Sequence, residues 1–150
     1  KTKSNQYRVK NILDIEQSIG LQTEQTYIDW ANDVNKLIVN LKDQVDEYRN
    51  WGYTIVGYGA AAKGMTLLNY TNLPLECIID DNPLKQGLLC PGVGTPVVSS
   101  DYINTLAFSD RVVFIPLAWN FYDEIRAKIL AKRTNLNDRF GRYYPHVEII

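Results

Sequence analysis

The sequence has few of the residues on which many functional sites depend. Among 150 residues there is one histidine, His146, and there are two cysteines, Cys77 and Cys90. A single histidine excludes a multi-histidine metal site and gives little support to a Ser/His or Cys/His catalytic pair. Two cysteines make neither a disulfide framework nor a metal set, so we expect both to be free thiols.

An excess of charge of one sign and long apolar runs are also missing. The 16 basic and 17 acidic residues leave a formal net charge of -1, without the basic excess of a dedicated nucleic-acid binder. No stretch reaches the roughly 18 apolar residues of a membrane span, and no signal-peptide pattern opens the chain. These absences favour a soluble, cytoplasmic protein that binds neither nucleic acid nor a membrane.

The size and the apolar content are those of one ordinary domain. With 150 residues and 45% apolar content, the chain can bury a sizeable core. Residues 1–25 are predicted to be a linker with a short amphipathic helix from Val9 to Gly20, where Gly20 is the C-cap. Residues 26–150 are predicted to be the domain proper. The chain starts at Lys1 without a methionine, as expected for a domain of a longer polypeptide or a processed terminus.

The segment from Thr26 to about Asn50 has the periodicity of a long helix. Apolar side chains recur at alternating three- and four-residue steps, which places them on one face over about seven turns. They are Tyr27, Trp30, Val34, Leu37, Leu41, Val45 and Tyr48. Thr26 and Asp29 predict a capping box at the start of the helix. We expect this apolar stripe to pack against the domain's own sheet, and the alternative is a coiled-coil or partner-binding helix.

The stretch from Tyr53 to Asp81 is predicted to organise the domain. A short apolar run is followed by small residues at the Gly-x-Gly-x-x-Gly/Ala spacing, then by a helical segment and a second apolar run. In this pattern Gly57 permits a tight turn, Gly59 lets the backbone approach a pyrophosphate, and Ala62 allows close helix–strand packing. The N–H groups and the dipole at the start of the helix favour an anion. The alternative is a plain strand–helix connection.

Polar residues that could contact such a ligand lie beside the turn and after the second apolar run. Lys63 adds a mobile positive charge, and Asp80 lies at about the distance from the turn expected of a ribose-binding acid, roughly 20 residues. The Gly- and Pro-rich loop 82–96 brings Asn82 and Lys85 to the carboxyl end of the second strand. We expect this loop to form a wall of the site, and a surface turn is the alternative.

The rest of the chain alternates apolar runs with helical segments. Strands are predicted at 97–98, 111–115 and 142–150, with Asn120 as the N-cap of the last helix. The inward-facing residues of that helix are Tyr122, Ile125, Ile129 and Leu130. This alternation predicts an α/β fold, Rossmann-like and three-layered, with an open, mainly parallel sheet and a long N-terminal helix. The loops after the first, second and fourth strands should converge on one cleft.

Four separated motifs occur in this order: GYGAAAKG, IIDDNPLKQG, Pro91-Gly92 and Ala118-Trp119-Asn120. Together they resemble the C-terminal domain of bacterial sugar C-methyltransferases, and residues 12–27 are similar to the segment that leads into that domain. The resemblance implies a Rossmann-like domain that helps to hold the nucleotide-linked deoxysugar. It also implies a zinc-binding domain and a central S-adenosylmethionine domain earlier in the polypeptide. The catalytic residues of that family belong to those parts, so none is carried over to this chain.

The chain departs from the family pattern at two places. The family usually has an arginine where this chain has Asp81, and Pro-Trp-Asn where it has Ala118-Trp119-Asn120. The Asp-Asp-Asn-Pro and Lys-Gln-Gly segments also resemble the nucleotide-sugar-binding domains of sugar acyltransferases and sugar dehydratases. These relatives imply one ligand class, a nucleotide diphosphate sugar, while the base and the sugar stay open.

We therefore predict the substrate-binding domain of a sugar C-methyltransferase, with no catalytic residue, metal or cofactor in this chain. Its expected partners are a nucleotide diphosphate sugar and the S-adenosylmethionine-binding domain of the same polypeptide. The candidate substrate-binding residues are Gly57, Tyr58, Gly59, Ala60, Ala61, Lys63, Gly64, Asp80, Asn82, Lys85, Trp119 and Asn120. The alternatives are a regulatory Rossmann domain that binds NAD or coenzyme A, and an interaction module that uses the long helix.

Overall fold

The structure, a computed structural model, describes residues 2–150, with side chains described from residue 6 onward. The chain divides into two compact units, Lys1–Lys36 and Leu37–Ile150. The division falls inside the long helix α2, Glu24–Asn50. The functional division into a linker over residues 1–25 and a binding domain over residues 26–150 stays a prediction.

The first unit contains helix α1, Thr2–Ser18, and the beginning of α2. The predicted C-cap at Gly20 is confirmed: Gly20 has a φ of +77°, its N–H donates to Gln17 O, and the N–H of Leu21 donates to Glu16 O. This pair of bonds is a Schellman motif, which needs the left-handed backbone that glycine adopts without strain. The helix itself begins seven residues earlier than the predicted start at Val9.

The predicted capping box at the start of α2 is wrong. The helix begins at Glu24, so Thr26 lies inside its first turn. The hydroxyl of Thr26 donates to Gly20 O at 2.8 Å, and the hydroxyl of Thr23 donates to the same carbonyl at 2.8 Å. The two threonines bind the end of the preceding turn, which sequence spacing within α2 does not reveal.

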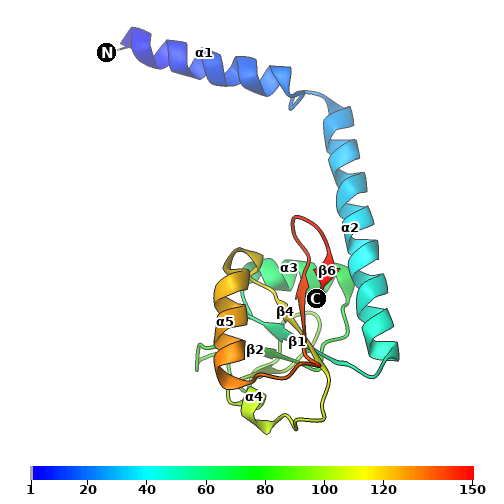
Figure 1. The fold of residues 1–150 in the computed structure, drawn as a ribbon. Coiled ribbons are helices and arrows are strands. Elements are labelled where there is room, and N and C mark those ends of the chain that lie inside the picture. The colour runs from blue at the N-terminus through cyan, green and yellow to red at the C-terminus, as the bar shows by residue number, and fades with distance from the viewer. Residues whose placement is uncertain (1) are drawn as a thin grey trace. The chain divides into compact units, whose positions relative to one another are not determined.

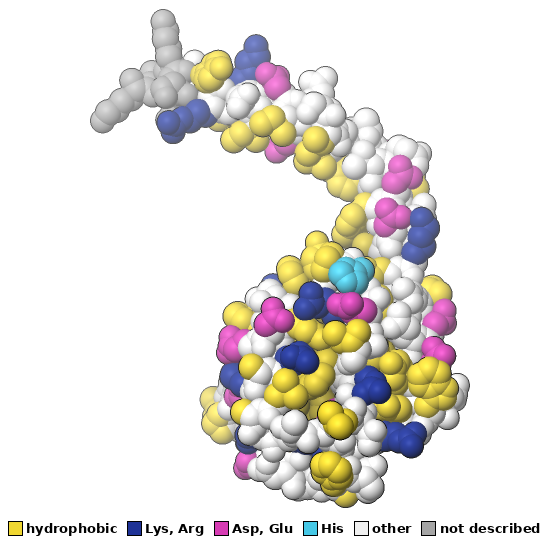
Figure 2. Space-filling view, in the orientation of Figure 1, with side chains coloured by type: hydrophobic (Ala, Val, Ile, Leu, Met, Phe, Trp, Pro, Cys, Tyr) yellow, Lys and Arg dark blue, Asp and Glu magenta, His cyan; other side chains and the backbone are white. Residues whose placement is uncertain are grey.

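The apolar stripe of α2 is buried over only part of its length. Leu41 and Val45 are fully buried, whereas Tyr27 is exposed and Trp30 is 66% exposed. The expectation that the stripe packs into the core of the sheet is confirmed at Leu41 and Val45, while Tyr27 and Trp30 belong to the first unit and are exposed. Figure 2 shows hydrophobic side chains on the surface of α1 and of the beginning of α2. Periodicity reports which face of a helix is apolar and does not report what covers that face.

The second unit is built on a six-stranded sheet. The strands are β1 Thr54–Tyr58, β2 Cys77–Ile79, β3 Val97–Val98, β4 Val112–Pro116, β5 Arg139–Arg142 and β6 Glu148–Ile149. Their order is β3-β2-β1-β4-β5-β6, and every neighbouring pair is parallel except β5 and β6. The predicted α/β, Rossmann-like class with a mainly parallel sheet is thereby confirmed.

Helices cover both faces of this sheet (Figure 1). The end of α2 and helix α3, Ala62–Thr71, contribute Leu41 and Leu68 to one core cluster. Helices α4, Tyr102–Thr105, and α5, Tyr122–Lys132, contribute to the other. Successive strand residues alternate between the two clusters, as the two-residue period of a strand requires. The predicted inward face of α5 is confirmed.

No helix within residues 2–150 is long and apolar enough to cross a membrane.

The predicted final strand over residues 142–150 is wrong. The chain forms β5 up to Arg142, reverses direction, and returns as the short antiparallel strand β6 at Glu148–Ile149. Pro145 lies in the reversal. A proline has no N–H to donate to a strand ladder, so the apolar run could not continue as one strand through it.

Candidate functional site

The candidate site lies at the carboxyl edge of the sheet, where β1 is flanked by β2 and β4. This is the point at which the strand order reverses, and ligands of open α/β sheets bind in the crevice outside such a point. Two contacts join the loops there. The N–H of Ala60 donates to Asp80 Oδ2 at 2.7 Å, and Lys63 Nζ donates to Asn120 Oδ1 at 3.3 Å. The loops after β1, β2 and β4 therefore meet, as the sequence predicted.

The glycines of the turn have different structural roles from those predicted. Gly57 lies inside β1, where a Cβ atom would come within 3.0–3.2 Å of Leu75, Leu117 and Ile78, so it permits close packing and not a turn. Gly59, with a φ of +96°, makes the turn. The close helix packing assigned to Ala62 belongs to Gly64, whose Cβ would lie 2.8 Å from Leu117 Cβ. The roles differ from those predicted because strand β1 continues as far as Tyr58, past the position of the predicted turn.

Three backbone donors of the turn already have partners inside the protein. The N–H of Gly59 donates to Ile79 O at 2.7 Å, that of Ala60 to Asp80 Oδ2 at 2.7 Å, and that of Ala61 to Gly59 O at 2.9 Å. The first turn of α3 differs, because Ala61 at its N-cap makes no side-chain capping bond. The initial N–H groups of a helix have no intrahelical acceptors. Donors for an anion at this edge thus lie in the first turn of α3.

Asp80 and Lys85 clamp the two loops to each other. Asp80 is 7% exposed, and its Oδ1 accepts the N–H of Asn82 at 2.9 Å. Lys85 Nζ donates to Asp80 Oδ2 at 3.1 Å and to Ala60 O at 2.8 Å. The side-chain oxygen of Asn82 in turn accepts the N–H of Leu84 at 3.0 Å. These contacts shape the site, while direct contact of the three residues with a ligand stays a prediction.

Lys63, Trp119 and Asn120 form an open group on the α3 side of the edge. Lys63 Nζ lies 5.2 Å from the centre of the Trp119 ring, and this ring lies 4.6 Å from the ring of Tyr144. The prediction that Asn120 caps the last helix is wrong: residues Trp119–Phe121 form a short 3₁₀ helix, η1, and α5 begins at Tyr122. The oxygen of the Asn120 side chain accepts from Lys63 instead.

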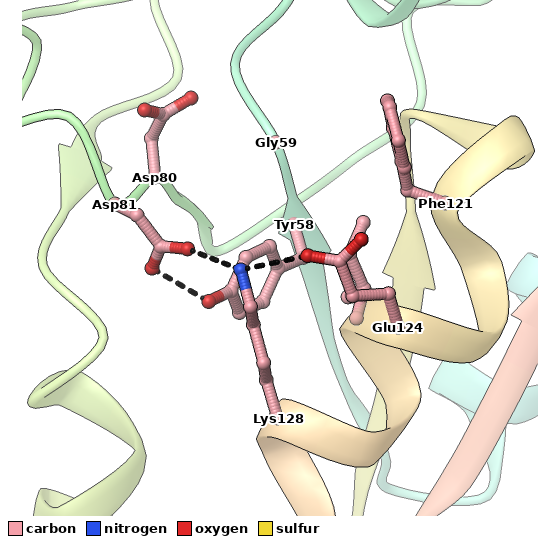
Figure 3. A pocket seen from close by; sticks show the side chains of 8 residues that line it. Tyr58, Gly59, Asp80, Asp81, Phe121, Glu124 and Lys128 are labelled. Atoms are coloured by element: carbon pink, nitrogen blue, oxygen red, sulfur yellow. Dashed lines mark hydrogen bonds and ion pairs between the residues drawn. The ribbon is translucent and has the colours of Figure 1, made fainter.

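A second group of charged side chains lines a cavity of about 220 Å³ on the α5 side of the same edge. The hydroxyl of Tyr58 donates to Asp81 Oδ1 at 2.7 Å. Lys128 Nζ lies 3.1 Å from Asp81 Oδ2 and 3.2 Å from Glu124 Oε1. Figure 3 shows these side chains converging, with the ring of Phe121 nearby and the Asp80 carboxylate turned away.

Sequence reasoning did not single out Lys128, Glu124 or Phe121 for this cavity. Glu124 and Lys128 have the spacing of an ordinary surface ion pair on a helix. The apolar face of α5 was the signal available, because it placed the helix over the sheet next to the end of β1. Tyr58, predicted to be a substrate-binding residue, is 4% exposed. Its ring belongs to the core, and its hydroxyl reaches Asp81.

Three ionisable groups of the cavity, those of Tyr58, Asp81 and Lys128, have pKa values shifted away from neutrality. Burial, with the hydrogen bond to Asp81 second, raises the pKa of Tyr58. The hydrogen bond from Tyr58 is the main cause that lowers the pKa of Asp81, and the bond to Asp81 is the main cause that raises the pKa of Lys128. Near neutral pH the cavity therefore contains a phenol donor, a carboxylate and an ammonium. This arrangement suits binding better than proton transfer.

His146 and the two cysteines make none of the hydrogen bonds described above. His146 is exposed on the surface, 3.4 Å from Glu148, and is the cyan side chain in Figure 2. Both cysteines are buried and free, as predicted. Among the residues that the structure describes, no three His, Cys, Asp or Glu side chains gather as metal ligands would.

Residues 1–144 match the family described as the C-methyltransferase C-terminal domain. The chain is also 31% identical over 120 residues to the C-methyltransferase NovU of Streptomyces niveus. That alignment covers 78% of this chain and 28% of the relative, so the chain spans about 28% of the relative's length. The family match extends over nearly all of the α/β unit and its carboxyl edge. This chain belongs to the family of C-methyltransferase C-terminal domains.

Proposed function

We propose that this chain is the substrate-binding domain of a sugar C-methyltransferase and that it holds a nucleotide diphosphate sugar. The diphosphate lies at the first turn of α3 and contacts Lys63. The observation that carries the proposal is the open group of Lys63, Trp119 and Asn120 beside the uncapped start of this helix, at the point where the strand order reverses. A helix start combines N–H donors with a positive dipole end, and both favour a phosphate.

The side chains of this group suit a sugar diphosphate. The Lys63 ammonium supplies a charge-assisted contact, worth about 1.5–3 kcal/mol for a hydrogen bond to a charged group. Trp119 is partly exposed, and a sugar ring can pack against its side chain. Asn120 can both donate and accept through its side-chain amide. Gly59 keeps the turn free of a Cβ atom where the ligand crosses the edge.

The clamp of Asp80 and Lys85 supports the proposal indirectly. It holds Ala60 through both its N–H and its carbonyl, and so keeps the turn in place before a ligand arrives. A site that is already in position loses less conformational entropy on binding. Recognition of the base or ribose by Asp80, Asn82 and Lys85 stays a prediction, because each of these side chains already makes a hydrogen bond within the protein.

Methyl transfer itself is proposed for the longer polypeptide, with the S-adenosylmethionine-binding domain as the partner of this one. Only one glycine-rich strand–helix turn occurs within residues 2–150, and it is assigned to the sugar nucleotide. We therefore expect this chain alone neither to bind S-adenosylmethionine nor to transfer a methyl group. Stoichiometric binding of S-adenosylmethionine in a calorimeter would contradict this assignment.

A second candidate function is a protein-interaction module. The exposed stripe around Tyr27 and Trp30 favours it, because monomers rarely leave so many large apolar side chains of two successive helices uncovered. Both functions can be present in one chain. The exposed part of the stripe lies before Lys36, in the first unit, and the carboxyl edge of the sheet lies in the second unit.

A thermal-shift screen of nucleotides tests the proposal. The ligands are uridine and thymidine diphosphate sugars, NAD, coenzyme A and S-adenosylmethionine. A ligand at 100 times its dissociation constant adds about 2.7 kcal/mol of stability, which is readily measured. We expect a shift with the diphosphate sugars. A shift with NAD or coenzyme A alone would support the regulatory alternative, and no shift with any nucleotide would favour the interaction module.

A matched pair of glycine variants controls the screen. Gly59→Val places a branched side chain where the ligand is proposed to cross, and we expect it to abolish the shift. Gly52 also has a positive φ, +83°, but lies away from the site with open space around it. Gly52→Val therefore introduces similar backbone strain and should keep the shift. If Gly59→Val binds as the parent does, the turn only connects a strand to a helix.

A further inference from the structure

A fourth loop reaches the carboxyl edge of the sheet, beside the three loops that the sequence predicted there. Strand β5 pairs parallel with β4, so both strands end at this edge. Tyr143 and Tyr144 directly follow β5, and Trp119 follows the end of β4 at Pro116. The β5–β6 turn, residues 143–147, therefore begins next to the loop that carries Trp119.

Two successive tyrosines of this turn contact the loop after β4. The hydroxyl of Tyr143, which is buried, donates to Leu117 O. Burial raises the pKa of Tyr143 to about 12, so this donor keeps its proton near neutral pH. The ring of Tyr144 lies 4.6 Å from the ring of Trp119, at an angle of 52°. Tyr143 thus fixes the backbone just before Trp119, and Tyr144 contacts the Trp119 side chain itself.

The orientation of the Trp119 ring depends on few contacts. Trp119 is 37% exposed, and among the residues that the structure describes its indole N–H donates no hydrogen bond. Two side chains lie against the ring: Lys63, with Nζ 5.2 Å from the ring centre, and Tyr144. An exposed side chain with so few contacts can change its rotamer at little cost. These two neighbours therefore set where the ring lies.

Of the two neighbours, Tyr144 is the one that keeps its place when a ligand binds. Lys63 is exposed, and in the proposed function, on which this inference rests, its ammonium contacts the diphosphate. Tyr144 carries no charge for the diphosphate to attract. Its ring therefore stays against Trp119 in the bound protein.

The turn that carries Tyr144 is anchored to the sheet. The N–H of Phe140 donates to Ile150 O at 2.8 Å, and the N–H of Ile150 donates to Phe140 O at 3.2 Å. The hydroxyl of Tyr48, on α2, donates to Ile149 O at 3.3 Å. The family match ends at residue 144, so the strand β6 that anchors the turn lies outside it.

We propose that Tyr144 positions the Trp119 ring as the wall against which the sugar of the nucleotide diphosphate sugar packs. A ring that is already held in place loses less conformational entropy when the sugar packs against it. The contact acts on the sugar, because the diphosphate is assigned to Lys63 and the first turn of α3. The turn after β5 is thereby a fourth wall of the site.

The test compares two ligands that differ by the sugar. Thymidine diphosphate glucose and thymidine diphosphate are titrated into the 150-residue chain and into the variants Tyr144→Ala and Tyr144→Phe, with affinities measured by calorimetry. We expect Tyr144→Ala to weaken binding of the sugar nucleotide about fivefold, within the range of one aromatic contact, and to change the affinity for thymidine diphosphate by less than about twofold. Tyr144→Phe keeps the ring and should bind both ligands as the parent does.

A second measurement follows the ring itself. The chain has three tryptophans, so the fluorescence of Trp119 is taken as the difference between each protein and its counterpart that also carries Trp119→Phe. In the free protein, Tyr144→Ala should move this emission to longer wavelength, because the ring becomes more exposed to water. Tyr144→Phe should leave it unchanged. An unchanged emission in Tyr144→Ala would show that Tyr144 does not hold the ring.

Tyr7→Ala is the matched control, because Tyr7 is an exposed tyrosine of the first unit. It should bind both ligands as the parent does. Parent-like affinity of Tyr144→Ala for the sugar nucleotide, an equal loss for both ligands, or an equal loss in Tyr144→Phe would overturn the role of Tyr144 while the proposed function stands. If neither ligand binds the parent, the proposed function fails and the role of Tyr144 fails with it.

Discussion

Two groups of polar side chains at the same sheet edge are built in opposite ways. Asp80 and Lys85 form a closed clamp, in which three loop donors and one carbonyl are joined by bonds of 2.7–3.1 Å. Lys63 and Asn120 form an open pair, joined by a single bond of 3.3 Å between exposed side chains. In each group a lysine ammonium donates to a side-chain oxygen, of Asp80 in one and of Asn120 in the other. What separates a structural group from one available to a ligand is how many of its polar atoms the protein itself uses.

The largest expected effect comes from breaking the clamp. Asp80→Ala removes the acceptor of the N–H groups of Ala60 and Asn82 and the partner of Lys85. We expect a loss of about 3 kcal/mol in the free energy of unfolding, because buried donors are left without an acceptor. Urea denaturation measures it. Asp101→Ala, at an exposed acid, should change stability by less than about 0.5 kcal/mol. Equal stability of both variants would show that the clamp is not structural.

A smaller loss is expected when α3 is pushed away from the edge. In Gly64→Ala the new Cβ would lie 2.8 Å from Leu117 Cβ, two residues before Trp119. Overpacking of this kind costs about 1–3 kcal/mol, partly offset by the better helix propensity of alanine. We expect a net loss of about 1–2 kcal/mol in thermal or urea unfolding. A gain in stability would mean that the start of α3 is loosely packed.

The smallest effect concerns the acid next to the clamp. The hydrogen bond from Tyr58 is the main cause of the lowered pKa of Asp81, so Tyr58→Phe should raise that pKa toward its ordinary value of 3.8. A carboxyl group with a lowered pKa stabilises the fold above its unfolded pKa, and this contribution is lost as pH falls through the folded pKa. NMR titration of the Asp81 carboxyl carbon measures the shift. An unchanged pKa in Tyr58→Phe would contradict the bond.

Much of the fold followed from residue patterns because those patterns report burial. The strand β4 and the inward face of α5 were located from apolar runs and helical spacing, and the alternation of strands with helices predicted the parallel sheet. These patterns do not report what lies opposite a surface. The apolar spacing in the sequence of α2 is the same at Trp30 as at Leu41, although of these two residues only Leu41 is buried.

The place where the loops meet was predicted from the sequence, and the contacts within them were not. Its place at the ends of β1, β2 and β4 follows from topology, and Lys63, Trp119 and Asn120 do come together. The hydrogen bonds that the Asp80 carboxylate accepts within the protein could not be predicted. Two of its partners are backbone N–H groups, which every residue type except proline carries. The hydrogen bond between Lys128 and Asp81 joins residues 47 positions apart in the chain, and no local pattern connects the two.

The central claim is that Lys63 and the start of α3 hold a diphosphate. The most direct measurement is the affinity of a uridine diphosphate sugar for the parent and for Lys63→Ala, by calorimetry at low and high salt. We predict that the substitution weakens binding by about ten- to a hundredfold at low salt, the worth of one charge-assisted contact. The difference should shrink as salt screens this exposed ammonium. Equal affinities of the two proteins at both salt concentrations would contradict the claim.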